Sequence, residues 1–283
     1  MHAGNEISDP DFARLRELIQ GECGIVLAPA KRPMLETRLR RRTRALAFSS
    51  VGAYCEYLFS PSGMRDEVIQ LIDVVTTNKT DFFREHAHFE YLVRSALPVL
   101  EKECGAGVRR TLVAWSAACS TGEEPYTLGM VLSEYAKTKA PSGFRFRIEA
   151  TDISTAVLET AVAGVYAEEA AQAIPAPLRA QYVLRSKDER QKCVRVAPQI
   201  RAGVRFRRLN LMDTDYHFSE AVDIAFCRNV LIYFDRDTQE KVLERIISVL
   251  RPGGFLMMGH SECLSGMDLP VSAIAPAIYR TRP

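Results

Sequence analysis

The chain has 283 residues, enough for one large domain or two smaller ones. Hydrophobic residues make up 47% of it and charged residues 25%, a globular composition that excludes the disordered and fibrous classes. Every apolar run is shorter than the roughly 20 residues that span a bilayer, and the acidic N-terminal segment has no signal-peptide core. A cytoplasmic protein without membrane insertion is therefore expected.

The seven cysteines are an odd number, and no two of them are spaced as C-x-x-C. Neither a disulfide framework nor a zinc site is indicated. The five histidines show no ligand spacing either, so we expect no metal.

The net charge of +2 conceals a strongly basic segment between Lys31 and Arg44. It carries seven basic residues and the single acid Glu36, which leaves the rest of the chain net acidic. The seven are Lys31, Arg32, Arg38, Arg40, Arg41, Arg42 and Arg44. Charge concentrated in this way steers partners, and a solvated helix face is the alternative interpretation.

The first 80 residues are predicted to form short helices. Asp9–Pro10 indicates an N-cap followed by proline in the first turn, and Gly24 suits the end of that helix. Apolar spacing predicts further helices from near Ala30, around 54–58 and around 68–72.

From about residue 108 strands alternate with helices, which predicts a parallel, doubly wound sheet. The predicted strands are Thr111–Ala117, Phe144–Thr151, Val204–Leu209, Asp223–Cys227 and Phe255–Gly259. The predicted helices are Glu123–Lys137, Thr155–Val162 and Thr238–Leu250.

Residues 165–205 interrupt this alternation and are predicted to form a small inserted β-subdomain. A short helix over Ile174–Tyr182 precedes two short strands, Tyr182–Arg185 and Cys193–Val196. The expected organisation is a helical domain with its linker over 1–85 and an α/β domain over 86–283.

In doubly wound sheets, ligands bind beyond the carboxyl ends of the strands. The first strand-to-helix turn, residues 116–125, has small side chains, a single glycine and the two acids Glu123 and Glu124. Carboxylates repel pyrophosphate, so this turn favours a ligand without phosphates, such as S-adenosylmethionine. A plain tight turn is the alternative.

Polar residues follow the other strands too. Asp152 is placed either to accept hydrogen bonds from ribose hydroxyls or to cap the next helix. Asn210 closes the next strand, and packing does not explain Arg228 and Asn229 directly after an apolar strand. Tyr233 is either part of the site or an ordinary core aromatic.

Six segments in chain order resemble the chemotaxis receptor glutamate methyltransferase family, of the CheR type. They are TTNKTDFFRE, WSAACSTGEEPYTL, ATDIS, FRRLNLMD, FCRNVLIYFD and LRPGGFLMMGHSE, and they cover most of residues 76–262. The resemblance implies an all-helical N-terminal domain, a Rossmann-like methyltransferase domain dependent on S-adenosylmethionine, and a small inserted β-subdomain. It also implies methyl transfer to glutamate side chains of chemoreceptors for sensory adaptation, with S-adenosylhomocysteine as product.

The resemblance assigns roles to individual residues. Those implied to contact the cofactor are Asn78, Thr80, Arg84, Glu124 (with Glu123 as the alternative), Asp152, Asn210, Leu211, Arg228 and Asn229. Arg84 and Tyr233 stand where the family places residues required for activity. Arg38, Arg41 and Arg42 are expected to bind the acidic methylation helices of the receptor. Some members grip a receptor C-terminal peptide with the insertion, and the glycine-free turn Ser186–Lys192 leaves that tethering open here.

The implied chemistry agrees with the residues present. Glutamate has a pKa of about 4.3, so it is already an anionic nucleophile and needs no general base. Two rival functions remain: methylation of a nucleic acid, and a non-enzymatic binding module. Amino-group methyltransferases often carry Asn/Asp-Pro-Pro-Tyr/Phe where this chain has Arg228–Asn229–Val230–Leu231, and no aromatics interleave with the arginines, so a nucleic acid is not expected as partner.

Overall fold

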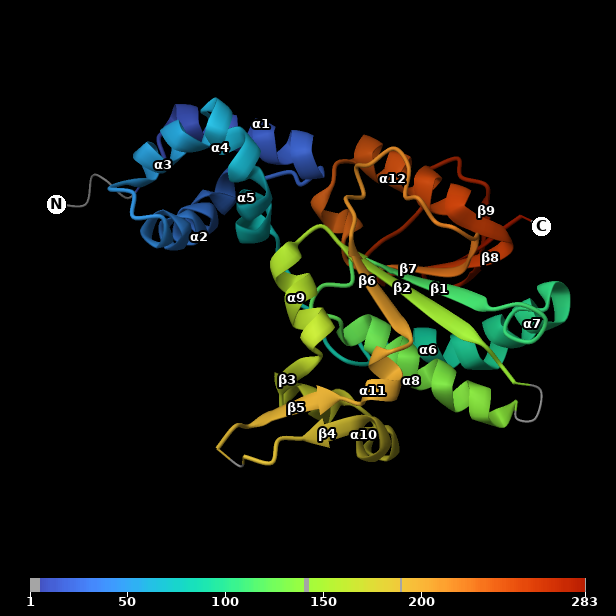
Figure 1. Ribbon diagram of the computed structural model, residues 1–283. Helices are drawn as coiled ribbons and strands as arrows, with labels where there is room; N and C mark the ends of the chain where they lie inside the picture. The colour runs from blue at the N-terminus through green and yellow to red at the C-terminus, as the bar shows by residue number, and fades with distance from the viewer. Residues whose placement is uncertain (1–5, 140–142, 189, 283) are drawn as a thin grey trace.

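The computed structural model describes residues 6–139, 143–188 and 190–282. Figure 1 shows a group of N-terminal helices beside a twisted sheet covered on both faces, with a small second sheet farther along the chain. The N-terminal helices are α1 Asp9–Cys23, α2 Arg32–Ala45, α3 Val51–Leu58, α4 Pro61–Asp66 and α5 Val68–Val75. Leu15, Ile19, Leu35 and Leu39 lie in their common core.

Local signals set the ends of these helices. The Ser8 side chain accepts from the Asp11 backbone N–H (3.1 Å), so the N-cap of α1 is Ser8 and not Asp9. Gly24 ends α1 at a φ of 74°, as expected. A 3₁₀ turn, η1 Pro29–Lys31, delays the start of α2, and Ser60 caps α4, a helix that was not predicted.

The main sheet has the strand order β6-β2-β1-β7-β8-β10-β9. Its strands are β1 Leu112–Ala117, β2 Phe146–Asp152, β6 Val204–Arg208, β7 Val222–Cys227, β8 Leu250–Met258, β9 Val271–Ala275 and β10 Ile278–Thr281. The first five in that order are parallel, whereas β10 runs antiparallel to both β8 and β9. The prediction of a wholly parallel sheet is therefore wrong at this edge.

Helices cover both faces of the sheet. Along β1, Leu112 and Ala114 belong to one apolar cluster, while Val113 and Trp115 belong to another. Figure 1 places α6, α7 and α8 on one side and α12 on the other. These helices, with α9 beside β2 and β6, are α6 Ala87–Tyr91, α7 Leu97–Cys104, α8 Glu123–Thr138, α9 Thr155–Ala163 and α12 Arg236–Val249. A π-helical turn, η2 Leu92–Ala96, joins α6 to α7, and this stretch was not predicted.

The predicted insertion forms a separate antiparallel sheet of order β3-β5-β4. Its elements, with their flanking helices, are β3 Val165–Ala167, η3 Ala170–Ala173, α10 Ala176–Tyr182, β4 Val183–Arg185, β5 Cys193–Val196 and α11 Pro198–Arg201. The turn Ser186–Lys192 includes residue 189, which lies outside the described residues.

Two features of the described chain bear on function. None of its helices combines the length and the apolar character that a membrane crossing requires. The chain also moves outward from β1 to β2 and β6, then returns to place β7 on the other side of β1. This reversal is a topological switch point, where doubly wound sheets bind their ligands.

Candidate functional site

A cavity lies at the switch point, at the carboxyl ends of β1, β2 and β7. It holds about 960 Å³ of empty space including its open mouth. Its wall contains every residue for which a cofactor or catalytic role was expected: Asn78, Thr80, Arg84, Glu124, Asp152, Asn210, Leu211, Arg228, Asn229 and Tyr233. The fold thus collects onto one surface residues that the sequence spreads over more than half of the chain.

The linker between the helical unit and the sheet crosses over the first strand-to-helix turn. The Ser120 hydroxyl donates to the Asn78 carbonyl (2.9 Å), and the Phe83 N–H donates to Thr127 Oγ1 on α8 (3.2 Å). These contacts fix Asn78, Thr80 and Arg84 along one side of the cavity. Arg84 is half-buried and donates to the Lys79 carbonyl (3.2 Å).

Left-handed backbone conformations shape the turns around the cavity. Ala118 (φ 59°), Ser120 (φ 50°) and Asn229 (φ 58°) all adopt positive φ without being glycine. Each such residue costs about 1–3 kcal/mol, and the surrounding contacts must hold it in place. The expected small turn after β1 is therefore also a strained one.

Asp152 lies at the end of β2 with both carboxylate oxygens in use. Oδ2 accepts from the Ser120 N–H (2.8 Å), and Oδ1 accepts from the Ser154 N–H (3.0 Å). Burial raises the pKa of Asp152, and the backbone donors oppose that shift in part. Ser154, not Asp152, caps α9 by accepting from Val157. Each carboxylate oxygen accepts one backbone N–H and can accept a second hydrogen bond, so Asp152 can also hold a ligand's hydroxyl groups.

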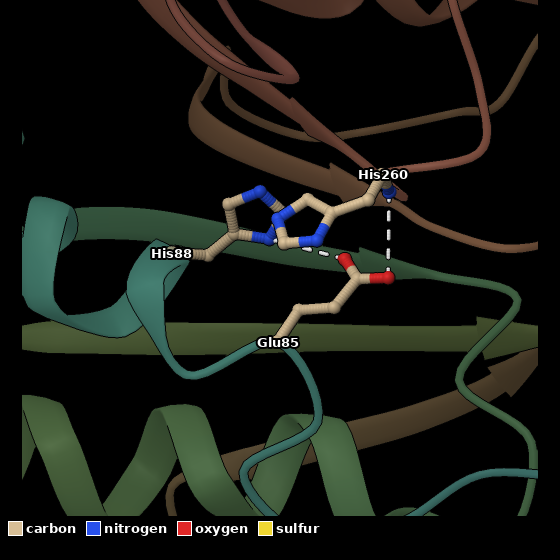
Figure 2. A group of neighbouring side chains, drawn as sticks. All are labelled: Glu85, His88 and His260. Atoms are coloured by element: carbon tan, nitrogen blue, oxygen red, sulfur yellow. Dashed lines mark hydrogen bonds and ion pairs between the residues drawn. The ribbon is translucent and has the colours of Figure 1, made fainter.

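The linker ends on Glu85, whose carboxylate faces three groups. Oε2 forms an ion pair with Arg228 (3.2 Å), and Oε1 accepts from the His260 backbone N–H (3.3 Å). The His88 ring lies on the same side, as Figure 2 shows. Burial favours a higher pKa for Glu85, but Arg228 and the other neighbours outweigh it, and the pKa is lowered.

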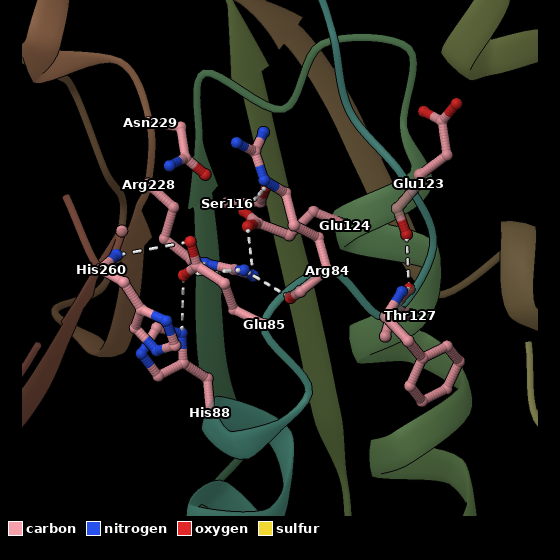
Figure 3. A network of polar contacts seen from close by, with 12 residues as sticks. Arg84, Glu85, His88, Ser116, Glu123, Glu124, Thr127, Arg228, Asn229 and His260 are labelled. Carbon is pink, nitrogen blue, oxygen red and sulfur yellow. Dashed lines mark hydrogen bonds and ion pairs between the residues drawn. The ribbon is translucent and has the colours of Figure 1, made fainter. Parts of the chain in front are cut away.

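Arg228 lies at the centre of a buried network of charged and polar side chains at the back of the cavity (Figure 3). Its guanidinium pairs with Glu124 Oε2 (3.0 Å) as well as with Glu85, and it donates to the Arg84 carbonyl. The other Glu124 oxygen accepts from the Ser116 hydroxyl (2.7 Å). Burial raises the pKa of Glu124, whereas Arg228 opposes that shift. With its side chain only 2% exposed, Arg228 organises the carboxylates around it more than it presents charge to a ligand.

The structure separates the two acids of the first turn. Glu124 lines the cavity, whereas Glu123 accepts from the Thr121 hydroxyl (2.6 Å) and is not part of the cavity wall. Glu124 is accordingly the candidate for ligand contact.

Asn210 and Leu211 form a wall where the helical unit meets the sheet. The Asn210 amide donates to the Glu22 carbonyl at the end of α1 (2.6 Å) and accepts from the Met212 N–H (3.0 Å). These two contacts hold the Asn210 side chain in the cavity wall and leave one amide N–H and one lone pair of the oxygen for a ligand, so its contact with the adenine edge stays a prediction.

Glu262, in the loop after β8, holds the turn that follows β7. Its buried carboxylate accepts four backbone N–H groups, from Asn229 (2.8 Å), Val230 (3.0 Å), Leu231 (2.8 Å) and Gly259 (2.8 Å). That turn leads directly into the 3₁₀ turn η4 Leu231–Tyr233, which ends at Tyr233. Glu262 lies inside the family-like segment LRPGGFLMMGHSE, but no local pattern there predicts its role.

The arginines expected to bind substrate lie outside the cavity, on α2. Arg38 donates to the carbonyls of Val75 (2.6 Å) and Thr76 (2.8 Å), and Arg42 pairs with Glu67 through two contacts of 2.6 and 2.7 Å. Arg41 is exposed. Both Arg38 and Arg42 thus also stabilise the protein's own structure, and their contact with substrate stays a prediction.

The cavity suits S-adenosylmethionine. Asp152 and Glu124 place carboxylates in the wall, which suit hydroxyl groups and a cationic ligand, and the same wall carries the basic residues Lys79, Arg84 and Arg228. Apolar residues that were not predicted complete the wall: Cys23, Ile25, Phe89, Ile153 and Phe234. Cys23 and Ile25 flank Gly24 at the end of α1, so the N-terminal helical unit contributes directly to the wall.

Comparisons with known proteins agree with this geometry. Residues 10–76 match the family model described as "CheR methyltransferase, all-alpha domain", and residues 78–277 match "CheR methyltransferase, SAM binding domain". A "Chemotaxis protein methyltransferase" of Escherichia coli (strain K12) is 38% identical over 96% of this chain and 91% of its own length. "Chemotaxis protein methyltransferase 2" of Pseudomonas aeruginosa is 38% identical over 95% and 92%, and a "Chemotaxis protein methyltransferase" of Borreliella burgdorferi is 35% identical over 97% and 95%. The all-helical domain, the methyltransferase domain and its cofactor S-adenosylmethionine are thereby established, and the chain belongs to the CheR methyltransferase family.

Proposed function

We propose that the protein transfers the methyl group of S-adenosylmethionine to glutamate side-chain carboxylates of chemoreceptors in the cytoplasm, forming methyl esters. One observation carries this proposal: the cavity wall combines carboxylates suited to a cationic cofactor with Arg84 and Tyr233, and among the described residues that line it there is no histidine to act as a general base. The names of the relatives support the choice of receptor.

The bound cofactor supplies an electrophilic methyl group on a positively charged sulfur. A receptor glutamate is ionised at neutral pH, so its carboxylate oxygen attacks the methyl carbon while the bonding pair stays on sulfur. No proton needs to move. The protein contributes alignment, which supplies roughly 7–11 kcal/mol in favourable cases, and exclusion of water from the carboxylate.

Charge balance explains why the cavity holds Arg228 in a neutralised state. An anion and a cation become two neutral groups in this reaction, so a free cation beside the carboxylate would stabilise the ground state more than the transition state. Arg228 is shared by Glu85 and Glu124, which cancels its charge. We assign Arg84 to orienting the cofactor's carboxylate and Tyr233 to donating a hydrogen bond to the incoming glutamate.

The exposed face of α2 is the proposed contact for the receptor's acidic helices. Arg41 and Arg44 are exposed there, and arginine suits paired contacts with carboxylates. Arg38 and Arg42 contribute by holding α2 against α5 and Glu67. The proposal does not require a receptor peptide on the inserted β-subdomain.

The first test is transfer of tritiated methyl groups to membranes that carry chemoreceptors, with label released by mild base as the readout. Wild type should give base-labile label, because carboxyl methyl esters hydrolyse readily. Asp152→Ala should abolish it by removing the ribose contact. Tyr233→Phe should lower turnover at saturating receptor while calorimetry finds cofactor affinity unchanged.

Base-stable label would indicate a methylated base or amine and would overturn the carboxylate assignment. Absence of label, in a protein that binds the cofactor by calorimetry, would favour the non-enzymatic binding module. Full turnover by Tyr233→Phe would remove Tyr233 from the reaction.

A further inference from the structure

Glu85, His88 and His260 form a compact cluster behind the cavity. Glu85 ends the linker, His88 lies on α6, and His260 follows β8 (Figure 2). Their potential ligand atoms all lie within 4.8 Å of one another, and the two imidazole ring centroids are 5.1 Å apart. Sequence spacing gave no hint of this cluster, because the strands β1 to β8 separate His260 from the other two.

His88 lacks the partners that a buried imidazole normally has. Its side chain is 1% exposed, and within the described residues neither ring nitrogen has a hydrogen-bond partner. Glu85 Oε2 lies 3.6 Å from Nδ1, too far for a hydrogen bond. Burial, followed by the charge of Arg228, lowers the pKa of His88 to about 4, so the ring is neutral. A buried polar group without a hydrogen-bond partner destabilises the folded protein. A ligand bound to these nitrogens would remove that cost.

We propose that Glu85, His88 and His260 bind a divalent transition metal ion, with Zn²⁺ as the ion whose ligand preferences they match. Two imidazoles and one carboxylate are a known donor set for zinc, with water in the remaining position. Bond lengths of about 2.0–2.2 Å require the three groups to move closer together. His260 is exposed and can do so by changing its side-chain conformation.

A supporting shell is already present around the carboxylate. Ligating carboxylates are usually hydrogen-bonded by other groups, and Arg228 provides that contact to Glu85 at 3.2 Å. The His260 N–H holds the second oxygen. A bound ion would join the linker, α6 and the loop after β8, and the first two of these segments contribute residues to the wall of the cofactor cavity.

The test uses the full-length protein, stripped of metal by a chelator. Zn²⁺ is titrated in competition with a chromophoric chelator, and Co²⁺ is titrated directly through its visible d–d absorption. We expect one site per chain in wild type, with affinity reduced at least about tenfold in His260→Ala and in His88→Ala. Because His260 is exposed, His260→Ala should fold normally even where His88→Ala does not. Zn²⁺ should also raise the melting temperature of wild type but not of His260→Ala.

His86→Ala and His217→Ala are the matched controls, since both side chains are exposed and lie outside the cluster. Cys263→Ser tests the nearest exposed thiol on the same loop. All three should bind Zn²⁺ as wild type does. The proposal is overturned if His260→Ala retains wild-type affinity, if Cys263→Ser loses it, or if the Co²⁺ complex shows a thiolate charge-transfer band.

Discussion

At the scale of single residues, the Glu262 carboxylate holds the backbone of the turn after β7 in place. It accepts four backbone N–H groups, three of which belong to the turn that carries Asn229 and precedes Tyr233. Because Asn229 is held at positive φ, the turn depends on these contacts to keep its shape.

Glu262→Gln should therefore weaken cofactor binding by disturbing the turn after β7, although Glu262 does not line the cavity. Glutamine has one acceptor oxygen and brings an N–H₂ group against backbone donors, so at least one buried N–H loses its partner, at about 1–3 kcal/mol. The denaturant midpoint and the calorimetric affinity for S-adenosylmethionine should both fall. Glu244→Gln, at an exposed position of α12, is the control and should change neither. Unchanged cofactor affinity in Glu262→Gln would contradict this role.

The raised pKa of Asp152 makes both cofactor affinity and folding stability depend on pH. In the proposed contact, ribose hydroxyls donate to the ionised carboxylate. Burial raises the pKa of Asp152, so cofactor affinity should be lost as pH falls through a value above the usual aspartate range. The folding contribution has the opposite sign: with the pKa raised in the folded state, it is fully present at low pH and lost as pH rises through that pKa. On acidification, cofactor affinity should therefore fall while the contribution of this group to stability increases.

The predicted loss of affinity can be checked by measuring cofactor affinity with calorimetry over a range of pH. Asp152→Asn should bind more weakly at neutral pH and should lose the part of the acid-side fall that Asp152 causes. Parallel curves for wild type and Asp152→Asn would show that Asp152 is not the titrating group.

At the scale of elements, α2 offers a matched pair of arginines with opposite expected effects. Arg42 pairs with Glu67, whose side chain is 4% exposed. Arg42→Ala leaves this buried carboxylate with the Tyr54 hydroxyl (3.1 Å) but without its cationic partner, and should cost about 3 kcal/mol of stability. Arg41→Ala should leave stability unchanged and lower kcat/KM for receptor. That loss should shrink at high salt, since exposed charges are screened.

Chemical denaturation and receptor methylation at two ionic strengths separate the two effects. Should Arg41→Ala methylate receptor as well as wild type at low salt, the α2 face would not be the receptor contact.

The elements themselves differ in how well the sequence predicts them. β1 was predicted because all six residues are buried, which gives a continuous apolar run. β9 and β10 were not, because both are short. In β9, a mostly exposed strand at the sheet edge, apolar and polar residues do not alternate. The stretch from α6 to α7 escaped detection where a π-helical turn shifts the apolar spacing away from the 3.6-residue period.

At the scale of the whole molecule, the sequence predicts the site well where strand ends create it. Residues such as Asp152 and Arg228 follow apolar strands, and parallel strands bring their carboxyl ends to one edge. Partners that come from loops distant in sequence were not predictable in the same way. Glu262 beneath the Asn229 turn and His260 beside His88 depend on how β8 is placed next to β7, which no local pattern encodes.

The N-terminal helical unit forms part of the wall of the cofactor cavity. Cys23 and Ile25 line it, the Val26 N–H donates to the Tyr233 carbonyl (2.8 Å), and Asp73 on α5 accepts from Thr155 at the start of α9 (2.6 and 2.8 Å). The cavity therefore lies at the interface between the N-terminal helices and the sheet-containing part of the chain. A ligand bound there opposes their separation, and separation releases the ligand, so cofactor occupancy and the docking of the N-terminal helices are a single linked equilibrium.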